Sequence, residues 1–265
     1  MKNSRSLKIK TAVILAAGMG IRLRELIGVC PKGLLKIDGK SLIVRSLELL
    51  KKEGIDRVII VTGFQGNMYL EHLKNKTNIP NIEFFKSPRF AESGSMHSLF
   101  VVKEVLREDF LLLESDLLYE SRALSSVLNF NGPDVVLASG KTGSKDEVYI
   151  YGDNTDEFSV LDESSKITCG KIKFISKHPC KNLSIKGELV GISKISLNLF
   201  KLMCSYHAEN LSFPCDNHYE ECISDLCSEK EVLFLCVDDL VWTEIDYQSH
   251  YDRAINVIYP KIIKK

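Results

Sequence analysis

The chain has 265 residues, 45% hydrophobic and 26% charged, a balance typical of a globular protein with a sizeable core. Its 35 basic and 35 acidic residues cancel, so no overall field favours nucleic acid or an anionic membrane, and any anion must be bound by local charge. No apolar run reaches the roughly 20 residues of a membrane span, and residues 1–8 lack the apolar core of a signal peptide, so we expect a cytoplasmic protein.

The first half of the chain alternates between β-branched apolar runs and segments with apolar residues at helical spacing. The expected strands are 11–17, 57–62, 82–86, 109–114 and 134–138. The expected helices are 41–53, 67–74, 96–106 and 121–128, the first with Ser41 as its N-cap and Gly54 after its last turn. Strands that alternate with helices predict a mainly parallel sheet with helices on both faces.

The pattern changes after Gly140, where short strands separated by polar turns are expected at 148–151, 158–161 and 171–175. Helices at 197–206, 218–226 and 250–263 and a strand at 232–241 follow. We therefore expect a single α/β domain over residues 1–265, Rossmann-like, with a mainly parallel mixed sheet flanked by helices. Residues of about 9–140 would form the nucleotide-binding core, and about 141–265 the acceptor-binding part, with a small, partly antiparallel lobe.

A glycine-rich segment follows the first expected strand, at the sheet edge where ligands of open α/β sheets gather. Glycine lets backbone N–H groups approach phosphate oxygens, while arginine and lysine side chains can neutralise a triphosphate. Two glycines alone would equally suit a solvated turn. The residues that we expect to bind the triphosphate are Leu15, Ala16, Ala17, Gly18, Gly20, Arg22 and Lys32.

A dinucleotide-binding oxidoreductase is the competing interpretation of this glycine pattern. Its fingerprint would require a small residue at position 23, where this chain has Leu23. Asp38 stands at the distance of a ribose-binding acid, but the pair Asp38-Gly39 is better explained as a turn before the next helix.

Carboxylates end two well-separated apolar segments. Glu114 and Asp116 follow the strand at 109–114, and Glu244 and Asp246 repeat this spacing more than a hundred residues later. Magnesium prefers carboxylate oxygens together with substrate phosphates, so Asp116 and Asp246 are the expected metal ligands. A strand-end aspartate can also cap a helix, and the two glutamates could orient the ion's ligands or remain solvated.

The loop at 91–99 is small and polar and leads into a helix. Its backbone and hydroxyl groups could bind the edge of a nucleobase, with Glu92, Ser93 and Gly94 as the candidates. A plain N-capping loop would explain the same serines.

The pattern Leu-Ala-Ala-Gly-x-Gly-x-Arg followed by Pro-Lys resembles the nucleotidyltransferases that activate sugar phosphates and phospholipid head groups. The resemblance implies a Mg²⁺-dependent enzyme that transfers a nucleotidyl group and releases pyrophosphate. It implies catalytic roles for Lys32, Arg22 and Asp116, and Mg²⁺ ligation by Asp116 and Asp246. One departure is Ile27, where the family often has threonine, so a hydroxyl contact of this loop is in doubt.

Further segments resemble the 2-aminoethylphosphonate cytidylyltransferases, which implies CTP as the donor and a small phosphonate or phosphate as the acceptor. Bacterial phosphocholine cytidylyltransferases are the close alternative, ahead of sugar-1-phosphate enzymes. The segments are 114–120, 138–142, 146–149, 187–193, 242–246 and 253–260. The expected acceptor-side residues, each of which would also suit a solvated surface, are Lys141, Glu188, Tyr219, Glu220, Trp242 and Glu244. A homodimer is compatible with the sequence.

Overall fold

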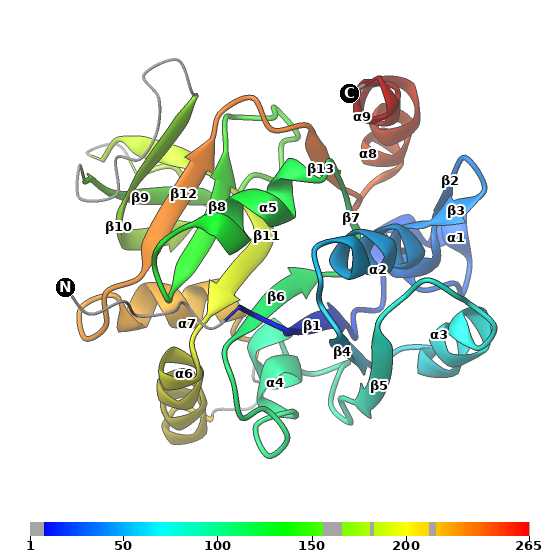
Figure 1. Cartoon of the computed structure of the whole chain (residues 1–265), viewed down its shortest axis with the longest axis horizontal. Helices are drawn as coiled ribbons and strands as arrows, with labels where there is room; N and C mark the ends of the chain where they lie inside the picture. The colour runs from blue at the N-terminus through cyan, green and yellow to red at the C-terminus, as the bar shows by residue number, and fades with distance from the viewer. Residues whose placement is uncertain (1–7, 156–165, 181–182, 212–215, 265) are drawn as a thin grey trace.

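The computed structural model describes residues 8–155, 166–180, 183–211 and 216–264, in which nine strands form one mixed sheet (Figure 1). Their order across the sheet is β5-β4-β1-β6-β11-β8-β12-β10-β9. The strands are β1 (Thr11–Ala16), β4 (Arg57–Thr62), β5 (Asn81–Lys86), β6 (Phe110–Glu114), β8 (Val135–Ser139), β9 (Tyr149–Asn154), β10 (Ile167–Ser176), β11 (Ile185–Ile195) and β12 (Leu233–Val237).

The strands of the first half, β5, β4, β1 and β6, run parallel, and so do β8 and β12. The remaining pairings are antiparallel, including those that place β11 between β6 and β8. The α/β fold with a mixed, helix-flanked sheet is therefore confirmed. The expectation that the sheet is mainly parallel was wrong: among the described residues four of its pairings are parallel and five are antiparallel, because the antiparallel strands of the second half continue the same sheet.

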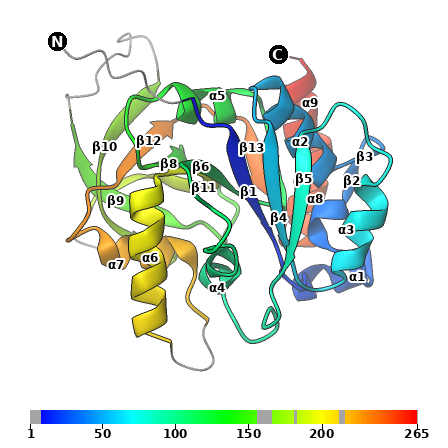
Figure 2. The same cartoon turned by 60° about the horizontal axis from the view of Figure 1, so that its bottom comes forward.

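Helices cover both faces of this sheet because its strands are apolar on both sides. Along β1, Ile14 packs in one hydrophobic cluster and Val13 in another. Figure 2 shows α4, α6 and α7 together on one side of the molecule. The helices are α1 (Arg24–Ile27), α2 (Leu42–Lys52), α3 (Gly66–Leu73), α4 (Ser95–Phe100), α5 (Arg122–Asn129), α6 (Leu197–Glu209), α7 (Tyr219–Leu226), α8 (Gln248–Arg253) and α9 (Tyr259–Ile263).

A third hydrophobic cluster lies under the C-terminal helices. The predicted helix at 250–263 begins earlier, as α8, passes through a π-helical turn at Ala254–Ile258, and ends as α9. Ala254 and Ile258 pack there against Leu23 and Leu42. Two small sheets complete the fold: β2 (Lys36–Ile37) pairs with β3 (Lys40–Ser41), and β7 (Leu117–Tyr119) pairs with β13 (Trp242–Glu244).

Several sequence-based boundaries were wrong. The helix expected at 96–106 ends at Phe100 and continues as turns, and the strand expected at 232–241 ends at Val237. The eleven-residue strand β11 was not predicted. The strand expected at 158–161 lies outside the described residues. Across the described parts of the chain, no helix combines the length and apolar character that crossing a membrane requires.

Candidate active site

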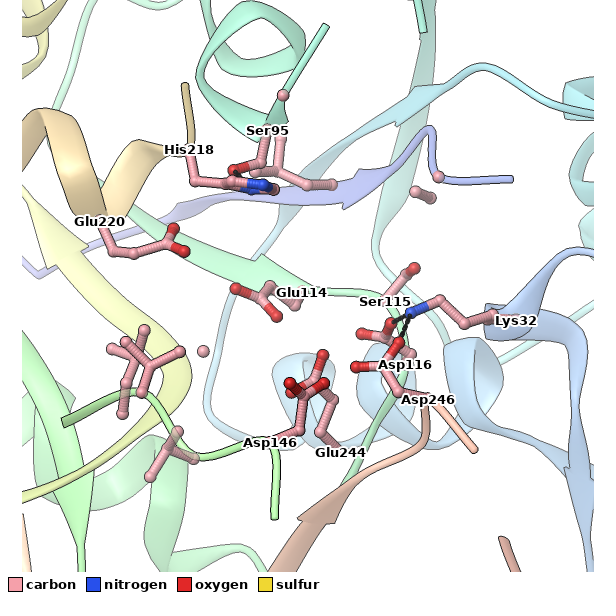
Figure 3. Close-up of a pocket in the computed structure, with 18 of the residues that line it drawn as sticks. Lys32, Ser95, Glu114, Ser115, Asp116, Asp146, His218, Glu220, Glu244 and Asp246 are labelled. Carbon is pink, nitrogen blue, oxygen red and sulfur yellow. Dashed lines mark hydrogen bonds and ion pairs between the residues drawn. The ribbon is translucent and has the colours of Figure 1, made fainter. Parts of the chain in front are cut away.

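A cavity of about 260 Å³ opens beyond the carboxyl ends of β1 and β6 (Figure 3). Its described lining holds seven carboxylates but three lysine or arginine side chains, so its charge is negative although the chain as a whole is neutral. The carboxylates are those of Glu114, Asp116, Asp146, Glu188, Glu220, Glu244 and Asp246, and the cations are Arg22, Lys32 and Lys177.

The glycine segment forms one wall of this cavity. Its members on the lining are Leu15, Ala16, Ala17, Gly18, Arg22 and Lys32. A Cβ at Gly18 would meet no atom within 4 Å, so its backbone is open to a ligand. Gly20 is not part of the lining; with φ at +58° it starts the short helical turn Ile21–Leu23 that carries Arg22.

Lys32 is placed by a close approach of its loop to the end of β6. A Cβ on the neighbouring Gly33 would lie 2.6 Å from the hydroxyl of Tyr69 and 3.1 Å from the carbonyl oxygen of Ser115, so only glycine fits. The Lys32 ammonium forms ion pairs with Asp116 and, at 2.7 Å, with Asp246. The two aspartates predicted to share a cation therefore share this ammonium.

Strand pairing explains how carboxylates so distant in sequence come together. β7 continues directly from the acidic end of β6, and β13 pairs antiparallel with it, with Glu244 opposite Leu117. The N–H of Ile245 donates to the carbonyl oxygen of Asp116 at 3.1 Å. This register carries the acidic residues of both segments to the same end of the cavity.

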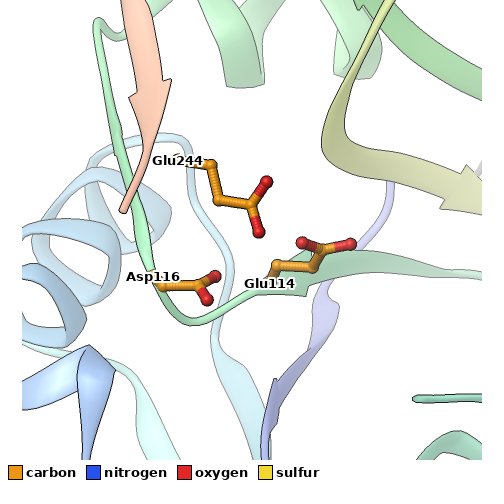
Figure 4. Close-up of side chains that lie close together, drawn as sticks. All are labelled: Glu114, Asp116 and Glu244. Carbon is orange, nitrogen blue, oxygen red and sulfur yellow. The ribbon is translucent and has the colours of Figure 1, made fainter. Parts of the chain in front are cut away.

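Three carboxylates converge within this arrangement (Figure 4). Oxygens of Glu114, Asp116 and Glu244 lie within 4.8 Å of one another. Burial, followed by repulsion from Asp116 and Glu220, raises the pKa of Glu114 to about 8. Burial and the neighbouring carboxylates raise the pKa of Glu244 well above its ordinary value. Carboxyl groups whose ionisation is opposed in this way offer oxygen ligands to a hard divalent cation such as Mg²⁺, which would favour their charged form.

For Lys32 and Asp246, unlike for Glu114 and Glu244, the surrounding charges favour the ionised form. Burial would lower the pKa of the Lys32 ammonium, but Asp116, Asp246 and Glu244 outweigh it and raise that pKa. Burial would likewise raise the pKa of Asp246, but Lys32, a hydrogen bond with Glu244 and Arg22 together bring it far below its ordinary value. Both groups are therefore charged across the neutral range.

Arg22 lies at the mouth of the cavity and is already engaged. Its guanidinium donates to Asp146 and to the Tyr247 hydroxyl, each at 2.8 Å, and lies 3.7 Å from Asp246. It also lies over the Tyr247 ring, 4.9 Å from the ring centroid. A phosphate that binds Arg22 must compete with these partners.

The loop at 91–99, predicted to bind the nucleobase and called the base-side loop below, reaches the cavity only in part. Ser93 and Gly94 line it together with Ser95, whereas Glu92 is exposed and does not. Ser93 uses its hydroxyl to bond the carbonyl oxygen of Arg89 at 2.7 Å.

The expected acceptor-side residues fall into different places. Glu188 and Trp242 line the cavity but have internal partners: both Glu188 oxygens accept hydrogen bonds from Thr142, and the Trp242 indole donates to Ser139 at 2.7 Å. Tyr219 is buried beside the cavity and donates to Glu114 at 2.9 Å.

Glu220 differs from these residues. Its side chain is buried and lines the cavity, and its Oε2 atom finds no hydrogen-bond partner among the described residues. Burial raises the pKa of this carboxyl. Figure 3 shows Glu220 and Glu114 pointing from opposite sides toward the interior.

Lys141 does not reach the cavity, contrary to the prediction. Its side chain is exposed, and its ammonium lies 5.7 Å from the centroid of the Tyr149 ring. Lys177 does line the cavity, and its ammonium is 3.5 Å from Asp146. Lys177 and His218 were not predicted, because nothing in their local sequence marks them, and Asp146 was included only as part of the segment 146–149.

Comparison with known proteins agrees with this geometry. Residues 11–140, which include β1, the glycine segment and Asp116, match the family model described as nucleotidyl transferase. The matched residues make up just under half of the chain. Five carboxylates of the lining, among them Glu244 and Asp246, lie outside the matched residues, and the β7–β13 pairing joins these two to the matched part.

The curated relatives of the chain include proteins named as cytidylyltransferases. A choline-phosphate cytidylyltransferase of Streptococcus pneumoniae is 32% identical over 42% of this chain and 46% of its own length. A CTP:phosphoglutamine cytidylyltransferase of Campylobacter jejuni is 24% identical over 92% of this chain and 98% of its own. The chain spans about half the length of several curated relatives that it matches.

The fold is shared with solved transferases over nearly its whole length. The inositol-1-phosphate CTP transferase of T. maritima superimposes with a TM-score of 0.77, at 19% identity, covering 97% of this chain and 96% of the other.

Proposed function

We propose that this protein is a Mg²⁺-dependent cytidylyltransferase that transfers CMP from CTP to 2-aminoethylphosphonate, giving CMP-aminoethylphosphonate and pyrophosphate. Relatives named as cytidylyltransferases support CTP as the donor. The acceptors in those names, choline phosphate and phosphoglutamine, are small and carry a nitrogen group, which supports an acceptor of this size.

The single observation that carries the choice of acceptor is the buried Glu220 carboxylate, whose Oε2 atom has no partner among the described residues. A buried anion requires a counter-charge or a hydrogen-bond donor. A primary ammonium supplies both, whereas sugar hydroxyls supply no charge. The excess of carboxylates in the cavity favours the same kind of acceptor.

Phosphocholine is the second candidate, but the same atom disfavours it. A quaternary ammonium has no N–H to donate to Glu220 and is best bound by open aromatic faces. The aromatic residues on the described lining are Tyr69, Phe90 and Trp242. Tyr69 is buried and the Trp242 indole donates to Ser139, so Phe90 is the one of these three with a partly exposed ring, which is fewer aromatic faces than a cage for a quaternary ammonium needs.

In the proposed reaction an oxygen of the acceptor phosphonate attacks the α-phosphorus, and the bond from that phosphorus to the β-phosphate oxygen breaks. The attacking oxygen is already anionic near neutral pH, so no general base and no covalent enzyme intermediate are needed. Lys177 and Arg22 would hold the acceptor and phosphate oxygens at the mouth of the cavity, and Lys32 would neutralise the triphosphate deeper inside. Asp116 and Asp246, with Glu114 and Glu244 beside them, would hold Mg²⁺, which supplies charge stabilisation at the phosphates.

Pyrophosphate release with CTP and Mg²⁺ tests this proposal. The acceptors to compare are 2-aminoethylphosphonate, phosphocholine, glucose 1-phosphate and ethylphosphonate, which lacks only the amine. Glu220→Gln should lower kcat/KM for 2-aminoethylphosphonate by about 10- to 100-fold, because a charged hydrogen bond contributes roughly 1.5–3 kcal/mol, and leave ethylphosphonate little changed. Preferential use of glucose 1-phosphate, or an equal loss for both phosphonates, would contradict the assignment.

A further inference from the structure

The loop on the nucleotide side and the helix on the acceptor side are joined at one point. The hydroxyl of Ser95, the first residue of α4, accepts from the N–H of Tyr219 at 3.1 Å and lies 3.2 Å from the Nδ1 atom of His218. The N–H of Met96 donates to the carbonyl oxygen of Asn217 at 3.3 Å. The start of α7 is therefore docked on the start of α4.

Gly94 makes this docking sterically tight. A Cβ at this position would lie 2.2 Å from the carbonyl oxygen of Asn217 and 2.3 Å from that of Asp216. Both contacts are with backbone, which cannot rotate away. Gly94 has φ of −79°, so close approach, and not an unusual backbone angle, requires glycine.

The first turn of α7 also contributes side chains to the candidate active site. Tyr219 donates its hydroxyl hydrogen to Glu114, a member of the three-carboxylate cluster, and Glu220 presents its unpartnered oxygen to the cavity. One helical turn thus contacts the base-side loop, the acidic cluster and the proposed acceptor position. Figure 3 shows Ser95 and His218 side by side, with Glu220 on the adjoining turn.

We propose that Ser95 is a positioning residue that couples nucleotide binding to acceptor binding. When CTP fixes the loop that carries Gly94 and Ser95, the Ser95 hydroxyl fixes the start of α7 and with it the Glu220 carboxylate. The nucleotide then increases acceptor affinity, and by thermodynamic reciprocity the acceptor increases nucleotide affinity. This inference rests on the proposed function, since it assigns Glu220 to the acceptor.

The test is the dissociation constant of 2-aminoethylphosphonate, measured calorimetrically with and without the α,β-methylene analogue of CTP, in Mg²⁺. In the wild type the analogue should tighten acceptor binding by about fivefold or more, in the usual range of coupling between sites. Ser95→Ala should reduce this ratio by about twofold or more, leaving only the coupling that the charges of the cavity supply by themselves. Ser95→Thr keeps the hydroxyl and should restore most of the ratio, which a general packing defect would not allow. Gly94→Ala should lower the ratio as well, because the added methyl group collides with the backbone of residues 216–217 and displaces the start of α7 from α4.

A wild-type ratio near one, or an undiminished ratio in Ser95→Ala, would overturn the coupling. Pyrophosphate release by the wild type separates this outcome from failure of the proposed function. If the acceptor is turned over but the ratio does not respond to Ser95, the coupling alone is wrong. If no small phosphonate or phosphate is turned over with CTP, the proposed function is wrong as well.

Discussion

Replacing Lys32 by methionine removes the cation around which the carboxylates of the cavity are arranged, while keeping a side chain of similar length. The ammonium pairs with Asp116 and with Asp246, at 2.7 Å, and both aspartates are buried. Removing one partner of a buried ion pair costs about 3–5 kcal/mol. Because the Lys32 side chain remains 17% exposed, we expect the free energy of unfolding near pH 7 to fall by about 2–3 kcal/mol.

The pH dependence of this loss follows from the two partners. The folded protein lowers the pKa of Asp246, so the stabilisation is present above the ordinary aspartate pKa and disappears as acid protonates Asp246. It raises the pKa of Lys32, so the stabilisation is complete below the ordinary lysine pKa and disappears in strong base. The contribution of Asp246 and Lys32 to the difference between wild type and Lys32→Met should therefore be constant from about pH 5 to pH 10 and shrink on both sides. Loss of the lysine also raises the pKa of Glu114 further, which should add to the difference above about pH 8.

Urea unfolding of both proteins, with and without millimolar Mg²⁺, measures the effect. The freed carboxylates should bind Mg²⁺ more tightly, so the ion should stabilise Lys32→Met more than the wild type. Lys177→Met is the matched control: the Lys177 side chain is 53% exposed, and we expect a change below about 1 kcal/mol. A Lys32→Met protein as stable as the wild type, or equal stabilisation of both by Mg²⁺, would refute the electrostatic reasoning.

Three further predictions concern other parts of the molecule. Asp116→Asn and Asp246→Asn should each lower the rate of pyrophosphate release by about 10²- to 10⁴-fold, and near-normal turnover in both would remove their metal assignment. Gly33→Ala should lower the urea midpoint, by about 1–3 kcal/mol in stability, because its methyl group collides with Tyr69, whereas Gly18→Ala should leave the midpoint unchanged and weaken CTP binding in calorimetry. Burial lowers the pKa of Lys194 to about 8, so above that pH the unfolded chain binds a proton that the folded protein has lost. The stability of the wild type relative to Lys194→Met should therefore rise from about pH 7 to pH 10. A difference that does not change with pH would contradict this prediction.

The parallel half of the fold could be predicted because its signals are local. Short apolar runs and helical spacing located its strands within a residue or two, and Gly54, with φ of +85°, ends α2 as expected. The helix at 96–106 was overextended for an instructive reason. The apolar residues at helical spacing in this segment are all fully buried: Met96, Leu99, Val102 and Leu106. After Phe100, however, consecutive turns bury them as well as a helix would.

β11 was missed because its sequence contains residues that usually interrupt strands. Gly187 and Gly191 lie within it, and Gly191 adopts φ of +81° where the pairing with β8 shifts register. A Cβ at Gly191 would come within 3.1 Å of the Glu114 carboxyl group, so this glycine is tied to the cavity. Such a requirement arises from tertiary packing and leaves no periodic signal.

The site residues divide in the same way. Gly18, Arg22 and Lys32 belong to one short segment, and the structure brings them to one cavity as their spacing suggested. Lys141 was placed at the acceptor from its position after a strand, yet its ammonium lies over Tyr149, and Lys177 occupies the cavity. Which of two exposed lysines reaches a ligand depends on how loops cross over the sheet, and one sequence does not encode this locally.

The charge of the cavity sets a condition on any polyphosphate that binds there. Arg22 is paired with Asp146, and Lys32 with Asp116 and Asp246, so neither cation is available without cost to a triphosphate. Additional positive charge must therefore enter with the nucleotide. Two cations suit the carboxylates of the cavity: a divalent ion at the acidic cluster, and the ammonium of an acceptor at Glu220. The divalent ion would release Lys32 from Asp116 and Asp246 toward the phosphates, and the ammonium would neutralise Glu220. Electrostatics alone therefore makes nucleotide, ion and acceptor bind interdependently, in the same direction as the contact between Ser95 and α7.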